Sequence, residues 1–313
     1  MEDKNLKILN TFDIYSLPNL DVAVLGALEM LSREELPNLD LSKIGERPLV
    51  VGSANAHAVG RIIFKDTQAR YSEEGDLMEN IKNFANTDSI VIVSASGGKH
   101  ANEVAKKLSG VPVWLFTNNK DAHAKEFVDK DRVVVFPKNR EPYTYNTSTY
   151  LSMIFSQTKE NPEEIFYHIE NIKKLVPYNF GKYDSFVMVV PSEFDEVRGM
   201  FRTKFDELFG GNVSVRVFTS EEVKHAKTVI PSDRELTIHF DFSSKMEIQT
   251  KNKDKHLYIP LRDSASYGEM ISVGYFVIGK IQEAHPAYFK NNIVEYTKDA
   301  SEIFNQKINP IVE

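Results

Sequence analysis

The chain has 313 residues, of which 42% are hydrophobic, a length and composition that allow two domains with buried cores. Its 38 basic and 45 acidic residues give a formal net charge of −7, and no basic cluster is interleaved with aromatic residues, which argues against a nucleic-acid partner. The absence of cysteine excludes disulfides, thiolate nucleophiles and cysteine-ligated metal sites.

The first half of the chain reads as a helical lead-in followed by an α/β domain. Residues 22–31 have helical spacing of apolar residues and precede a polar stretch with proline, so we expect a lead-in over residues 1–45. Short apolar runs follow at 48–51, 89–93, 111–116 and 132–136, separated by segments of helix length. This alternation predicts a parallel sheet wrapped by helices, with a helix over 150–155 closing the layer.

The second half repeats this alternation. The polar segment 157–164 carries Pro162 near the start of another predicted helix, and we place the domain boundary there. Strands are expected at 185–190, 213–218, 235–240 and 256–261, and helices near 194–209, 264–283 and from 287 to the end of the chain. The sequence therefore predicts an α/β protein with domains at 46–158 and 159–313.

A turn rich in serine and glycine follows the apolar run at 89–93. It reads Ser-Ala-Ser-Gly-Gly-Lys-His over residues 94–100 and leads into apolar residues with helical spacing from 101 to 108. Backbone amides at a helix start and the hydroxyls of Ser94 and Ser96 suit a phosphate without a metal. We therefore predict an anion site formed by Ser94, Ser96, Gly97, Gly98, Lys99 and His100. The simpler interpretation is a glycine-rich turn with serine caps.

A second small-residue turn follows the run at 48–51. The spacing from Gly52 to Gly60 does not fit the dinucleotide-binding fingerprint. Ligands of open parallel sheets bind beyond the carboxyl ends of the strands, where both Ser53 and the turn 94–98 are expected. We add Ser53 to the predicted binding residues.

The matching turn of the second half has a different character. Residues 191–196 carry three carboxylates and no glycine, and these acids would repel a phosphate. Only the first half is therefore expected to bind the anion. The second half either supplies acid–base groups or is a structural duplicate.

Two features of the second half fit acid–base chemistry. Lys204 and Glu207 lie three residues apart on a predicted helix, although most such pairs are solvated surface ion pairs. His225 lies in a charged loop after the run at 213–218 and suits proton transfer near neutral pH. The other histidines show no metal-ligand spacing, so no metal is predicted. The polar start of the chain and the lack of a long apolar stretch predict a cytoplasmic protein with no membrane partner.

Together these segments resemble the sugar isomerase (SIS) domain family, and most closely its tandem-domain isomerase members. The turn 94–98 resembles the family's Ser-Gln-Ser-Gly phosphate loop, and residues 141–149 resemble its Glu-x-x-Val-Ala-Ser-Thr-Lys segment. Residues 222–225 resemble Glu-Leu-Lys-His, residues 199–207 the helix with Lys-x-x-Glu, and residues 304–313 a lysine-bearing tail. The order is the same, and the likeness runs from about residue 45 to the end.

The resemblance implies two flavodoxin-like SIS domains and cofactor-free interconversion of ketose and aldose phosphates, a role in carbohydrate metabolism. Glu207 matches the base between C1 and C2, and His225 the ring-opening residue that a neighbouring subunit supplies, which implies a homodimer with shared active sites. Lys204 matches a lysine beside the base, and Lys307 a lysine on the tail that closes over the sugar. Ser53, Ser94, Ser96 and Thr147 fall at or beside positions that bind phosphate and sugar hydroxyls.

The chain also departs from the family pattern. His100, preceded by Lys99, stands where a threonine is usual, and the spacing from Glu207 to His225 is two residues longer, with an insertion near 209–211. We expect no glutaminase domain, since the sequence has no cysteine to serve one. The sequence leaves three functions open: a phosphosugar isomerase acting on a hexose phosphate or its amino derivative, an amino-sugar phosphate deaminase or deglycase, and a non-catalytic sugar-phosphate-binding regulator.

Overall fold

The protein is described here from a computed structural model that covers residues 2–73, 75–83, 86–108, 111–176, 179–245 and 255–313. Contacts divide the chain into two compact units. The smaller unit comprises residues 34–138 and 149–159, and the larger unit comprises residues 1–33, 139–148 and 160–313. Residues 1–33 and 139–148 thus pack with the second half of the chain, while the sequence-based boundaries after residues 45 and 158 stay predictions.

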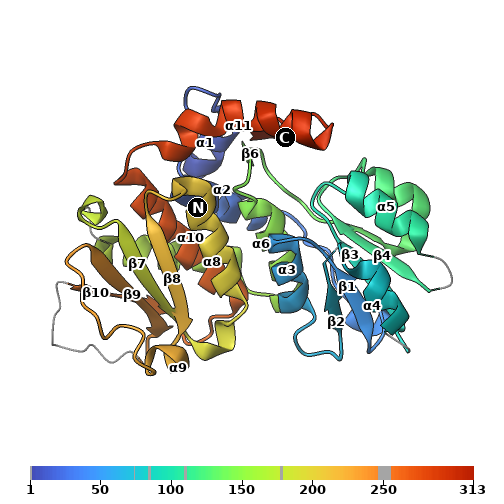
Figure 1. Ribbon diagram of the computed structural model, residues 1–313, viewed down its shortest axis with the longest axis horizontal. Helices are drawn as coiled ribbons and strands as arrows, with labels where there is room; N and C mark the ends of the chain where they lie inside the picture. Colours follow the sequence, from blue (N-terminus) through green and yellow to red (C-terminus); the bar gives the residue numbers. More distant parts are fainter. Residues whose placement is uncertain (1, 74, 84–85, 109–110, 177–178, 246–254) are drawn as a thin grey trace. The chain divides into compact units, whose positions relative to one another are not determined.

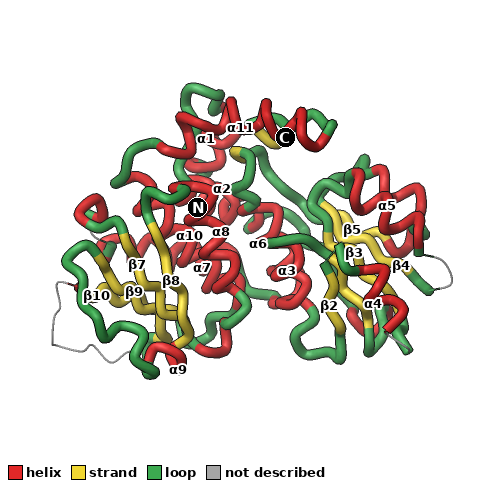
Figure 2. Tube along the Cα trace, in the orientation of Figure 1, coloured by secondary structure: helices red, strands yellow, loops and turns green. Residues whose placement is uncertain are grey.

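The smaller unit contains a five-stranded, fully parallel sheet with strand order β2-β1-β3-β4-β5, whose strands are the yellow segments of the tube in Figure 2. Four of its strands confirm the predicted apolar runs, whereas β2 was not predicted because its sequence, Arg-Tyr-Ser, has no apolar run. The strands are β1 (Pro48–Val51), β2 (Arg70–Ser72), β3 (Ser89–Val93), β4 (Val113–Thr117) and β5 (Val133–Val135).

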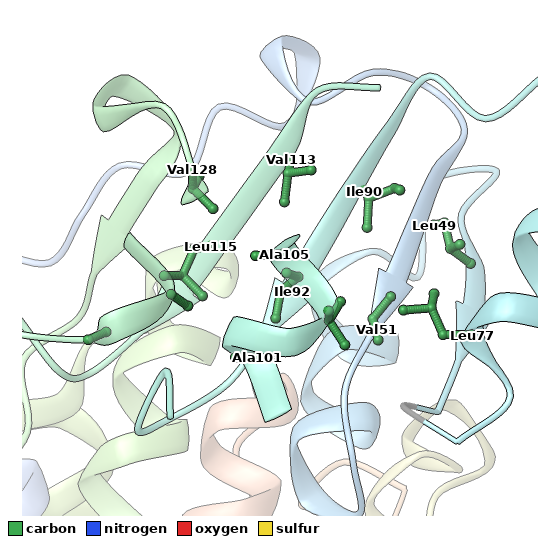
Figure 3. Packing of buried hydrophobic residues seen from close by; sticks show 13 residues of the cluster. Leu49, Val51, Leu77, Ile90, Ile92, Ala101, Ala105, Val113, Leu115 and Val128 are labelled. Carbon is green, nitrogen blue, oxygen red and sulfur yellow. The ribbon is translucent and has the colours of Figure 1, made fainter. Parts of the chain in front are cut away.

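Side chains from the strands and from helix α5 form the core of this unit. Figure 3 shows Ile90, Ile92 and Leu115 on the strands facing Ala101 and Ala105 of the helix, and all five are at most 3% exposed. Burial on both faces explains why these strands read as continuous apolar runs. The helices of the unit are α3 (Asn55–Ile63), α4 (Leu77–Asn83), α5 (Lys99–Lys107) and most of α6 (Thr147–Thr158).

The larger unit contains a four-stranded parallel sheet with strand order β10-β9-β7-β8. Each strand overlaps a predicted one, which confirms the second alternation of strands and helices. The strands are β7 (Ser185–Val190), β8 (Ser214–Thr219), β9 (Glu235–Phe242) and β10 (His256–Leu261). The chain therefore has two parallel α/β sheets flanked by helices, as the sequence predicts.

Helices surround this second sheet in Figure 1. Helix α7 starts at Pro162, and the side chain of Asn161 caps it by accepting a hydrogen bond from the Glu163 amide at 2.9 Å. Helix α2 packs against α10 so closely that a Cβ at Gly279 would lie 2.0 Å from the Asp21 nitrogen. The helices are α1 (Lys4–Thr11), α2 (Leu20–Leu31), α7 (Pro162–Ile172), α8 (Val197–Phe209), α9 (Ser220–Val223), α10 (Tyr267–Glu283) and α11 (Tyr288–Phe304).

The end of the chain corrects one prediction. Helix α11 does not continue to the C-terminus but stops at Phe304, where Asn305 adopts a left-handed conformation with φ of 47°. The chain then forms a short strand, β11 (Ile311–Val312), which pairs antiparallel with β6 (Glu141–Pro142). Pro310 favours this extended path because proline cannot continue a helix. Within the described residues, every helix is too short or too polar to cross a bilayer.

Candidate functional site

The turn after β3 delivers backbone amides and hydroxyls to the start of α5 in the smaller unit. Gly97 has φ of +55°, and a Cβ there would lie 2.4 Å from the Cβ of Ala122, so only glycine fits. The Gly98 amide donates to Ser96 Oγ at 3.3 Å, and Gly98 is the N-cap of α5. The first amides of the helix have no acceptor within the helix, which leaves them directed at the turn. These features are the ones that the predicted anion site requires, and the site itself stays a prediction.

The turn after β1 adjoins this one because β1 and β3 are hydrogen-bonded neighbours. Ser53 is exposed, and Ala54 has φ of 48°, a strained conformation for a residue with a side chain. A Cβ at Gly52 would lie 3.0 Å from the backbone of Ala56 and His57. The two turns thus lie at the same edge of one sheet, as the sequence predicts for a ligand crevice.

In the larger unit, Lys204 and Glu207 form an ion pair on α8 whose Nζ and Oε2 atoms are 2.5 Å apart. The Lys204 side chain is fully buried, whereas 24% of the Glu207 side chain is exposed. Lys204 also donates a hydrogen bond to the Thr144 carbonyl and lies 5.7 Å from the centre of the Tyr275 ring. The ion pair is therefore largely buried and is not a solvated surface pair.

Burial raises the pKa of Glu207, and the nearby Lys204 ammonium opposes that rise. A carboxylate that holds a proton more tightly than usual is suited to taking a proton from carbon and returning it. The buried ammonium favours the ionised form of Glu207, against the effect of burial. The pair has the electrostatics of a general base with a tuning cation.

The loop 143–146, in which the Thr144 carbonyl accepts a hydrogen bond from Lys204, has an unusual backbone conformation. Thr144 and Asn146 have φ values of 71° and 48°, in a region that residues with side chains seldom adopt. The loop is fixed on both sides, because Tyr143 N donates to Pro310 O at 2.9 Å and Thr147 N donates to Glu141 Oε2 at 2.7 Å. Such enforced strain concentrates at functional sites.

A cavity of about 650 Å³ opens beside Glu207. Its wall is formed by the loop 143–146, by the C-terminal end of α8 with the following turn, and by one face of α11. We call it the aromatic cavity, because Tyr143, Phe209, Tyr288, Phe289 and Tyr296 line it. All of these residues belong to the larger unit.

Thr147, His225 and Lys307 are not among the described residues that line this cavity. Thr147 is 1% exposed and donates its hydroxyl to Glu141, so Thr144 and Asn146 line the cavity in its place. His225 is exposed on the turn after α9, and Lys307 is exposed between α11 and β11. Lys99 and His100 begin α5, and their side chains lie outside what the structure describes.

Sequence reasoning missed the cavity wall contributed by α11. Tyr288, Asn292 and Tyr296 recur every four residues and therefore share one helix face, a signal that the sequence contains. No three potential metal-ligating side chains gather among the described residues.

No family model matches the chain, and no curated protein matches it in sequence. Solved structures resemble it at low identity. Glucosamine-6-phosphate deaminase from Thermotoga maritima matches with a TM-score of 0.58 at 14% identity, over 84% of this chain and 92% of that one. Tagatose-6-phosphate ketose/aldose isomerase from Escherichia coli matches with a TM-score of 0.55 at 14% identity, over 90% and 91%.

The C-terminal domain of glucosamine-fructose-6-phosphate aminotransferase from Francisella tularensis matches with a TM-score of 0.56 at 12% identity, over 93% of this chain and 97% of that one. These matches span nearly the whole of each chain and extend over both sheets. The chain therefore has the fold of the tandem sugar isomerase (SIS) proteins.

Proposed function

We propose that this protein is a phosphosugar isomerase-type enzyme that moves a proton between C1 and C2 of a ketose or aldose phosphate. The observation that carries the proposal is the Lys204–Glu207 pair, because a buried cation and a carboxylate of raised pKa open onto a cavity of ligand size. The fold of proteins that are named for sugar-phosphate chemistry supports the same assignment.

In the proposed reaction, the Glu207 carboxylate removes a proton from C1 of the ketose, and the electron pair of the C–H bond forms the C1–C2 double bond while the C2=O double bond breaks and O2 takes up a proton, which gives an enediol. The same proton, or one exchanged with water, then returns from Glu207 to C2, while the O1 hydroxyl loses its proton and the C1=O bond of the aldose forms. No oxidant or reductant is required. Ser53, Ser94, Ser96 and the amides at the start of α5 would bind the phosphate. We further propose that a homodimer brings His225 of one subunit to the active site of the other. Lys307 lies on the C-terminal tail, which we propose closes over the sugar.

A measurement of hydrogen exchange tests this proposal. The protein is incubated with fructose 6-phosphate in deuterated water, and deuterium is sought at C1 of the ketose and at C2 of the aldose. We expect exchange that is lost in Glu207→Gln and retained in Glu196→Gln, a matched change just before α8 that lies outside the cavity wall. Light scattering tests the homodimer in the same sample, and an active monomer would contradict it.

Binding without exchange across a panel of hexose and amino-hexose phosphates would instead favour the regulator. His100 in place of the usual threonine is the observation that supports this second candidate. Release of ammonia or an amine from an amino-sugar phosphate would identify a deaminase or deglycase that uses the same base.

A further inference from the structure

Two histidines meet on neighbouring strands of the sheet in the larger unit. His239 Nε2 and His256 Nδ1 are 2.9 Å apart, which is hydrogen-bond distance. The centres of the two rings are 5.2 Å apart, so the rings meet at these nitrogen atoms and not face to face. One ring donates its N–H to the other, and a single proton therefore occupies the space between the two nitrogens.

The strand register explains why the sequence does not signal this pair. Strand β10 is the edge strand of the sheet and pairs with β9 (Figure 1). Tyr258 lies opposite His239 and His256 lies opposite Thr237, so the two histidines are diagonal neighbours on one face of the β9–β10 ladder. They are 17 residues apart along the chain, a spacing that does not mark a metal site in a sequence.

The histidine pair lies on the sheet face away from α8, the helix that carries the Lys204–Glu207 ion pair. Side chains alternate between the two faces of a strand, and Phe240, the residue after His239, packs against Phe201 of α8. His239 therefore points to the opposite face. Both histidines are partly exposed there, which gives an ion access from solvent, and neither is among the described residues that line the aromatic cavity.

Packing and burial prepare both rings to act as metal ligands. The ring of Tyr258 lies nearly parallel to that of His239, with centres 4.7 Å apart and planes 10° apart, and this contact orients the imidazole. Burial lowers the pKa of His256, and burial together with the neighbouring His256 lowers the pKa of His239 to about 4. Both imidazoles are therefore neutral at pH 7, which is the form that binds metal ions.

The separation of the two nitrogens suits a transition-metal ion. Metal–nitrogen bonds of ~2.0–2.1 Å place two nitrogens ~2.9 Å apart at the right angle between neighbouring ligands of a square-planar or octahedral ion. A tetrahedral ion with the same bond lengths holds them ~3.3 Å apart. The observed 2.9 Å therefore matches the square-planar or tetragonal geometry of Cu²⁺ and Ni²⁺ better than the tetrahedral geometry of Zn²⁺.

We propose that His239 and His256 bind one divalent transition-metal ion, with Cu²⁺ or Ni²⁺ preferred and with water completing the coordination. When the ion binds, both rings turn their facing nitrogens toward it. The proton between the rings moves to the outer nitrogen of its own ring, so two neutral imidazoles release no proton. The bound ion cross-links the edge strand β10 to β9, and its binding does not depend on the proposed isomerase activity.

Calorimetric titration with metal ions tests the site by itself. Protein that has been freed of metal with a chelator is titrated with Ni²⁺ and, separately, with Mn²⁺ at pH 7.5. We expect one Ni²⁺ per chain, bound at least about tenfold more tightly than Mn²⁺, because imidazole ligands suit nickel whereas carboxylates suit manganese. Equal binding of the two ions, or no saturable binding of Ni²⁺, would overturn the proposal.

Substitution of each ligand locates the bound ion. His239→Gln and His256→Gln should each weaken Ni²⁺ binding by at least about tenfold, because each removes one of the two protein ligands. His123→Gln is the matched control, since His123 is exposed and lies in the smaller unit. Unchanged affinity in both ligand variants, or an equal loss in the control, would contradict the assignment.

Electron paramagnetic resonance of the unsubstituted protein keeps the test independent of how the variants fold. With one equivalent of Cu²⁺, the spectrum should show coupling to two imidazole nitrogens. In whichever ligand variant folds, the coupling should fall to one imidazole. A copper spectrum of the unsubstituted protein without two imidazole nitrogens would overturn the proposal.

Discussion

Replacement of Lys204 by methionine tests the idea that the Lys204–Glu207 pair is a buried, tuned base. Methionine is close to lysine in length and leaves no charge of its own in the interior. The change removes a fully buried ammonium from a carboxylate 2.5 Å away, and it also leaves the Thr144 carbonyl without its donor. Both the stability of the protein and the protonation of Glu207 should respond.

The expected loss of stability follows from the two acceptors left behind. Removing one member of a buried ion pair costs about 3–5 kcal/mol because the remaining charge is uncompensated. Glu207 keeps 24% of its side-chain surface exposed, so water screens part of that charge. We therefore expect about 3 kcal/mol of lost unfolding free energy at pH 8, near the lower end of that range.

The loss should depend on pH in a defined direction. Burial already raises the pKa of Glu207, and removing the ammonium that opposes this rise raises the pKa further. The folded variant then binds a proton that the unfolded chain releases, so its stability increases as the pH falls. The difference from the parent protein should shrink between pH 8 and pH 5.5. In the exchange assay, the acidic limb of the pH–activity profile should move to higher pH, because Glu207 acts as a base only when it is deprotonated.

Urea unfolding followed by circular dichroism at pH 8, 7, 6 and 5.5 measures these effects. Lys298→Met, at an exposed position on α11, is the control and should change stability by less than about 0.5 kcal/mol. The double variant with Glu207→Gln should show a coupling energy of at least about 1 kcal/mol. A loss below about 1 kcal/mol at pH 8, or a loss that is the same at both ends of the pH range, would refute the reasoning.

Three further predictions concern other parts of the molecule. Ser96→Asp places a negative charge in the turn before α5 and should abolish the thermal stabilisation by fructose 6-phosphate; an undiminished shift would remove this turn from the site. Gly97→Ala forces a left-handed residue whose Cβ would lie 2.4 Å from that of Ala122, and it should cost about 1–3 kcal/mol in denaturant titrations. Burial and the neighbouring His256 lower the pKa of His239 to about 4, so protonation favours the unfolded chain. Stability should therefore fall by up to about 3 kcal/mol as the pH drops from 6.5 to 4. His239→Gln should flatten that slope, and an unchanged slope would show that another group causes it.

The sheets could be predicted from the sequence because their strands are buried on both faces. Residues 90–93 and 186–190 are continuously apolar, which is the pattern that a central parallel strand requires. The missed strands lack that pattern. β2 is an edge strand that reads Arg-Tyr-Ser, and β11 has two residues whose pairing with β6 depends on contacts about 170 residues apart.

The candidate site could be predicted only in part. The spacing of Lys204 and Glu207 places them on one helix face, but spacing does not distinguish a solvated pair from a buried one. Their burial comes from Thr144 and Tyr275, which lie 60 and 71 residues away in the sequence. The positive φ values of the loop 143–146 have no glycine to signal them, because neighbouring hydrogen bonds enforce the conformation.

The most direct test of the account is a crystal structure of the protein with fructose 6-phosphate. We expect the phosphate within hydrogen-bond distance of the Ser94 and Ser96 hydroxyls and the first amides of α5. In the same complex, a Glu207 carboxylate oxygen should lie about 3 Å from C1 or C2 of the sugar. A phosphate bound away from that turn, or a sugar whose C1 and C2 are out of reach of Glu207, would contradict the account.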